Sequence, residues 1–125
     1  MKVSIEQSHH QIIDWKRELE FYKEEIDLLE KRLTEVIAKN TNQEVLASAE
    51  HFQNKFLLLK ESQDRLHDVL NAKKAYLEKQ AAEVGPHIHH KILEESVALN
   101  EEIQYFSKSI SELRLEFNTF LAKVF

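Results

Sequence analysis

The feature that most limits the fold of this chain is that glycine and proline occur once each, side by side, as Gly85 and Pro86. Average composition would place about nine glycines and six prolines in a chain of this length. Glycine supplies positive φ angles and proline supplies fixed corners, so a chain with many tight turns needs both residues. A chain that almost lacks them and is rich in Glu, Lys, Leu and Ala is typical of long helices.

Two long stretches carry apolar residues at alternating spacings of three and four, which is the pattern of a helix packed along one seam. The first seam covers 5–36, and only Ser8 in it is neither aliphatic nor aromatic. The second covers 89–124, and its polar members, His89 and Ser96, both lie near its start. Both stretches are therefore predicted to be amphipathic helices.

The middle stretch is less regular. It keeps the same spacing over 49–77 but places Gln63 and Lys73 on the seam. Additional apolar residues predict a wider buried stripe, as expected for a helix that contacts two neighbours. These additional residues are Val69, Ala72, Tyr76, Ala81 and Val84.

Two breaks divide the chain into three predicted helices. The polar stretch 39–44 interrupts the apolar period, and either Thr41 or Asn42 suits the N-cap of the second helix. At the second break, Gly85 suits a helix end and Pro86 cannot continue a helix, which favours a turn over a kinked continuous helix. The predicted helix bounds are about 4–38, 43–84 and 87–124.

Helices of this length with short connections predict one all-α domain over 1–125, an elongated antiparallel up-down-up three-helix bundle. With Trp15 in its first helix, this three-stranded, coiled-coil-like layout resembles the spectrin-repeat type of bundle. If the turns are centred near residues 41 and 86, His9 lies level with Lys73. The ends of the second and third helices then extend beyond the first helix.

Charge and composition exclude several classes of function. The net charge is −5, and the basic residues are interspersed with acids, unlike the clustered basic surface of a nucleic-acid-binding protein. No apolar run approaches the ~18 residues of a membrane span. There is no cysteine, which excludes thiolate chemistry and fits a reducing compartment, so we expect a cytoplasmic protein without nucleic-acid or membrane partners.

Three histidines follow the glycine–proline pair, and two of them suggest a weak metal site. His87 and His90 share a helix face, as do His90 and Glu94, and Glu83 lies across the turn. Imidazole and carboxylate groups bind Zn²⁺ or Ni²⁺. Three imidazoles at a helix N-terminus would also repel its dipole when charged, so this end is alternatively pH-responsive. The simplest interpretation is that these are solvated residues at the start of a helix, so neither a metal nor a cofactor is predicted.

Apolar residues outside the seams suggest an interaction surface. Ile13, Phe21 and Leu28 are spaced eight and seven apart on the first helix, where they either form a second stripe or widen the core. Further apolar residues outside the seams are Leu57, Leu58, Leu93, Leu115 and Leu121. At the predicted overhang, the first helix would leave uncovered a second set of residues that includes Leu77, Val84 and Ile88.

No catalytic motif occurs in the sequence, and a slender bundle offers little volume for a substrate pocket. We therefore expect no enzyme activity and no small-molecule substrate. The sequence predicts a structural or protein–protein interaction module that presents helix faces to a second copy of itself, as a homodimer, or to another helical protein. The alternative is a weak metal-binding or pH-responsive bundle that uses His87, His89 and His90.

Overall fold

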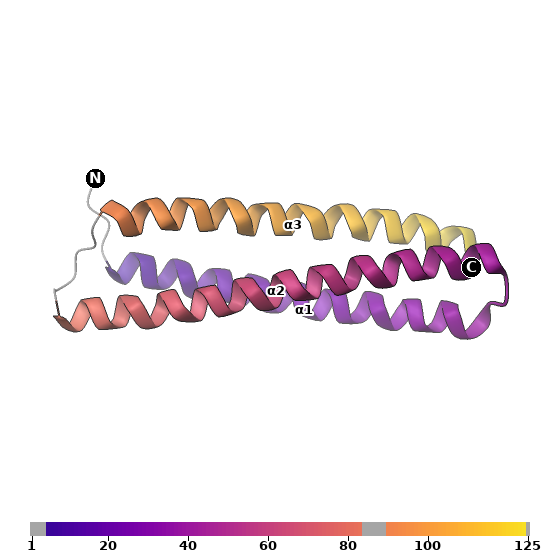
Figure 1. Ribbon diagram of the computed structural model, residues 1–125, viewed down its shortest axis with the longest axis horizontal. Coiled ribbons are helices and arrows are strands. Elements are labelled where there is room, and N and C mark those ends of the chain that lie inside the picture. Colours follow the sequence, from indigo (N-terminus) through magenta and orange to yellow (C-terminus); the bar gives the residue numbers. More distant parts are fainter. Residues whose placement is uncertain (1–4, 84–89, 125) are drawn as a thin grey trace.

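The protein is an all-α three-helix bundle (Figure 1). The structure, a computed structural model, describes residues 5–83 and 90–124, and these ranges contain no strand. The helices are α1 (Ile5–Lys39), α2 (Gln43–Glu83) and α3 (His90–Val124). The predicted fold class is confirmed, and the helix bounds agree with the prediction to within three residues. Residues 4, 84 and 87–89, which were also assigned to helices, lie outside the described residues.

Ion pairs between the helices define their directions. Lys60 on α2 lies 3.0 Å from Glu30 on α1, and His9 near the start of α1 lies 3.4 Å from Glu78 near the end of α2. On the other side of α2, Lys73 lies 2.9 Å from Glu95. Figure 1 shows the result: α2 runs against both neighbours, and α1 and α3 are parallel. The reversal between α2 and α3 rules out a kinked continuous helix.

Two asparagines form hydrogen bonds to the backbone at the helix ends where α1 meets α2. The Nδ2 group of Asn40 donates a hydrogen bond of 2.9 Å to the carbonyl of Val36, one of the last carbonyls of α1 that lack a helical partner. Asn42 then acts as the N-cap of α2, because its Oδ1 accepts hydrogen bonds from the amides of Glu44 at 2.8 Å and Val45 at 3.4 Å. Of the two predicted caps, the structure selects Asn42.

The core follows the predicted seams. On α1 every seam residue is buried except Ser8 and Tyr22, which are half-buried. On α3 the seam is buried over 99–117 and partly buried at its end. The largest fully buried side chains come from all three helices, so one continuous core holds the bundle together. These side chains are Phe56, Phe117, Leu19, Ile26, Leu66, Leu70, Ile103, Ile110 and Val36.

The two polar seam residues of α2 are accommodated differently. Lys73 is half-buried and extends its ammonium group to Glu95, so its aliphatic stem remains at the seam. Gln63 is 4% exposed and is the buried polar residue of the described core. The wider stripe predicted for α2 is mostly wrong. Only Val69 packs against the core, because the side chains of Ala72, Tyr76 and Ala81 point to solvent.

Aromatic side chains determine how α3 packs. The α1 and α2 backbones pair closely, whereas α3 lies farther from both (Figure 1). Four phenylalanines fill the space between α2 and α3, with the ring centroids of Phe52 and Phe117 5.1 Å apart and those of Phe56 and Phe117 5.3 Å apart. The ring centroid of Phe120 also lies 5.1 Å from that of Phe52. Bulky rings at a helix contact favour a larger interaxial distance between α2 and α3 where these rings lie.

The axial alignment of the helices differs from the prediction. His9 contacts Glu78, five residues beyond the Lys73 that was predicted to lie level with it. Lys73 contacts Glu95, whereas a turn centred near residue 86 would place Leu99 level with Lys73. Because α1 extends farther along α2 than predicted, it covers Leu77, which is only 2% exposed. The predicted overhang is therefore wrong at Leu77, while Val84 and Ile88 lie outside the described residues.

Candidate interaction surface

The apolar face predicted on α1 is present in part. Phe21 and Leu28 are 61% and 65% exposed. Ile13 is half-buried and does not continue their line. The reason lies in helical geometry. Position 13 follows a seam residue directly, whereas positions 21 and 28 come two residues after one, which places them about 100° farther around the helix.

The other apolar residues outside the seams are also partly exposed and partly buried. Leu57, Leu58 and Leu115 are exposed, as predicted. Leu121 is buried at 8% exposure, because it faces the core in the last turns of α3 and widens the seam there. Leu93 lies outside the residues whose side chains the structure describes.

Most of the candidate metal ligands lie outside the residues that the structure describes. His87 and the side chains of Glu83 and His90 lie outside them, and Glu94 is exposed. In the part of the chain that the structure describes, no three histidine or acidic side chains are grouped closely enough to hold a metal ion. Three other histidines instead lie 3.4 to 3.9 Å from single carboxylates, namely His9, His10 and His51.

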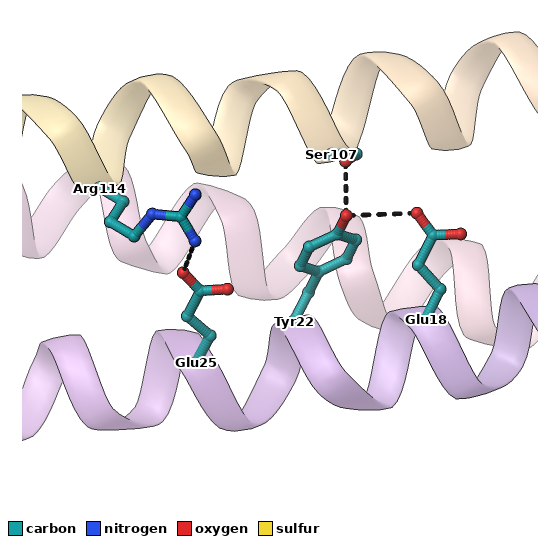
Figure 2. A network of polar contacts seen from close by, with 5 residues as sticks. All are labelled: Glu18, Tyr22, Glu25, Ser107 and Arg114. Carbon is teal, nitrogen blue, oxygen red and sulfur yellow. Dashed lines mark hydrogen bonds and ion pairs between the residues drawn. The ribbon is translucent and has the colours of Figure 1, made fainter.

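A polar network joins α1 to α3 (Figure 2). The Tyr22 hydroxyl donates to Glu18 at 3.2 Å and lies 2.5 Å from the Ser107 hydroxyl. Since tyrosine carries one hydroxyl proton, Ser107 must donate to Tyr22. One turn farther along α1, Glu25 pairs with Arg114 of α3. The Tyr22–Ser107 and Glu25–Arg114 contacts join the two parallel helices and fix their alignment. The second carboxylate oxygen of Glu25, Oε2, is buried without a hydrogen-bond partner among the residues that the structure describes.

A groove with a volume of about 830 Å³ lies between α2 and α3. Its floor is apolar and consists of core residues of both helices, namely Leu59, Leu66, Phe106 and Leu113. The groove exists because small side chains, Ser62, Ala98 and Ser109, flank the seam at this level. Two large side chains rise from its edges: Leu58, which is 58% exposed, and Tyr105, which is 74% exposed.

The two edges of the groove carry opposite charges. The α2 edge contributes Lys55 and Arg65 and no acid. The α3 edge contributes only acids among its charged residues, and these are Glu101, Glu102, Glu112 and Glu116. An open groove with an apolar floor and charged edges suits a helical protein partner, whereas small-molecule sites enclose most of their ligand.

A second, smaller hollow continues this groove toward the end of α3. It shares Glu112 and Glu116 with the first hollow and adds the exposed Leu115, the half-buried Phe120 and a basic residue of α3, Lys123. His51 on α2 lines it and lies 3.5 Å from Glu116. The α2/α3 groove therefore extends over several helical turns.

Tyr105 is the residue of this surface that the sequence pattern did not single out. It lies two residues after Ile103 of the seam, a position that points away from the core. Tyr105 rises beside an open groove because a small residue of α2, Ser62, lies nearby. Helix periodicity alone does not show which residues of different helices lie together. The sequence feature that could have pointed to this surface is a large residue, Tyr105, followed four residues later by a small one, Ser109.

Three comparisons with known proteins give no relative: no family model, no curated protein and no solved structure matches this chain. The resemblance to the spectrin-repeat type of bundle is therefore one of length and layout. In addition, no helix among the described residues is long and apolar enough to cross a membrane.

Proposed function

We propose that this protein is a non-enzymatic interaction module that associates with a second copy of itself through the faces of its helices. The observation that carries this proposal is the α2/α3 groove, in which an apolar floor lies open between Leu58 and Tyr105. Exposed apolar residues grouped in a concave surface are a common property of protein interfaces. Tyrosine in particular is enriched at such sites, because it combines a large apolar area with a polar end.

Association in the cytoplasm is part of the proposal. The chain has no cysteine, so its stability does not depend on the disulfides that secreted domains of this size often use. The pairs of His51 with Glu116 and of Lys60 with Glu30 join side chains that are more than a third exposed, and such pairs contribute little stability. The apolar core carries the fold, and the apolar groove is available for a partner.

Sedimentation equilibrium of the full chain over a hundredfold range of concentration tests this proposal. We expect the mean mass to rise from that of one 14.8 kDa chain toward twice that value. A mass that stays at one chain throughout the range contradicts self-association. The same measurement with and without Zn²⁺, at pH 5.5 and 7.5, tests the alternative prediction for His87, His89 and His90, which requires a response to metal or pH.

A further inference from the structure

The charges of the α2/α3 groove indicate how two copies would meet, and this inference rests on the proposed self-association. We infer that the groove is the interface of a symmetric homodimer whose two-fold axis runs parallel to the helices, so that α2 of each copy lies over α3 of the other. A closed dimer uses the same patch on both copies, which this arrangement provides.

Two ion pairs that cross the groove show which residues of α2 and α3 lie at the same height along the bundle axis. Arg65 lies 3.4 Å from Glu102, and His51 lies 3.5 Å from Glu116. Between these two pairs, each step along α2 is matched by one step in the opposite direction along α3. Lys55 therefore lies level with Glu112, as do Leu58 with Ser109 and Ser62 with Tyr105.

A two-fold rotation about an axis parallel to the helices leaves the height of every residue along the bundle unchanged. It places the α2 edge of one copy opposite the α3 edge of the other. Lys55 then faces Glu112 of the second copy, so opposite charges meet. Leu58 faces Ser109 of the second copy, and Tyr105 faces Ser62 of the second copy, so each large side chain meets a small one. Because the axis is two-fold, each of these contacts occurs twice.

A second closed arrangement has its axis perpendicular to the helices. It places α2 over α2 and α3 over α3, so the basic edges face each other and the four glutamates of one α3 edge face those of the other. Like charges brought together at an interface are unfavourable. The separation of charge between the two edges therefore selects the parallel axis.

Charge reversal tests this interface. In sedimentation equilibrium of the full chain, we expect Lys55→Glu and Glu112→Lys each to raise the dimer dissociation constant at least about tenfold, since each brings like charges together twice. The variant with both changes restores the attraction with reversed polarity, so its dissociation constant should return to within about threefold of the wild-type value. Thermal unfolding of each variant shows whether the monomer remains folded.

A pair of truncations provides the matched control. Leu58→Ser and Tyr105→Ser remove exposed apolar groups from the groove and should also weaken the dimer about tenfold or more. Phe21→Ser and Leu28→Ser remove groups of similar exposure from α1 and should leave the dissociation constant unchanged.

The possible outcomes separate the two proposals. Dimers that are lost in the α1 variants but retained in the groove variants would overturn the inferred interface while the proposed self-association stands. A wild-type protein that remains monomeric would overturn both. If both single charge variants weaken the dimer and the combined variant does not recover, the inferred pairing of edges is wrong.

Discussion

At the scale of single residues, the polar side chains at helix ends and on the seam carry most of the information that the apolar pattern lacks. Asn42 is the N-cap of α2. Lys60 forms an ion pair that joins α2 to α1. Gln63 is a buried amide in an apolar core. Each has a physical role that can be measured separately from the bundle as a whole.

Replacing the N-cap of α2 should destabilise the protein. Asn42→Ala removes the acceptor for the amides of Glu44 and Val45, and loss of such a cap costs about 1 kcal/mol. Chemical denaturation measures the change in the free energy of unfolding. Thr41→Ala, at the neighbouring exposed position, is the matched control and should change that free energy by less than about 0.5 kcal/mol. Equal effects at the two positions would show that Asn42 is not the cap.

The pair between Lys60 and Glu30 should make stability depend on pH in the alkaline range. The hydrogen bond to Glu30, aided by its charge and those of Asp27 and Asp64, raises the pKa of Lys60 above its ordinary value of 10.5. The folded state therefore favours the protonated lysine. The resulting stabilisation is complete below pH 10.5 and is lost as the pH rises through the higher pKa of the folded state.

Lys60→Met isolates this contribution. Because both side chains are more than a third exposed, the substitution should lower the free energy of unfolding by less than about 1 kcal/mol at pH 7. The difference from the wild type should decline as the pH rises above 10.5. Lys31→Met, on the exposed face of α1, is the control. A difference that stays constant, or grows, above pH 10.5 would contradict the assigned pair.

At the scale of helices, the period of apolar residues was sufficient to predict three long helices and the buried residues of α1 and α3. It was not sufficient for α2, where Tyr76 and Ala81 continue the apolar pattern but point to solvent. Periodicity reports which residues of one helix lie on the same face. The width of the buried face depends on the distances to neighbouring helices, which the pattern of a single helix does not report.

The buried amide of α2 should be a site where stability can be gained. Gln63→Leu replaces a polar side chain at 4% exposure with an apolar one of similar size, which removes the cost of burying an amide. We expect the free energy of unfolding to rise by about 1 kcal/mol. Gln53→Leu, on the exposed face of the same helix, should have little effect. A loss of stability in Gln63→Leu alone would show that the amide has a required polar partner.

At the scale of the whole molecule, the order and direction of the helices followed from the sequence, but their axial alignment did not. Turn centres estimated from the polar stretches placed His9 level with Lys73, whereas His9 pairs with Glu78. Alignment depends on how side chains of different helices fit together, and this fit also determines which exposed residues share a surface. For that reason Phe21 and Leu28 were found from the sequence, while the groove beside Tyr105 required the structure.

The most direct test of the inferred dimer is a disulfide between two different copies, because the chain has no cysteine of its own. Leu58→Cys and Ser109→Cys proteins are mixed, oxidised and analysed by mass. We expect the mixed dimer to exceed both homodimers, since the parallel axis places position 58 of one copy over position 109 of the other, and a disulfide requires Cα atoms about 4.4 to 6.8 Å apart. Predominant cross-linking of Leu58→Cys to itself would contradict the arrangement.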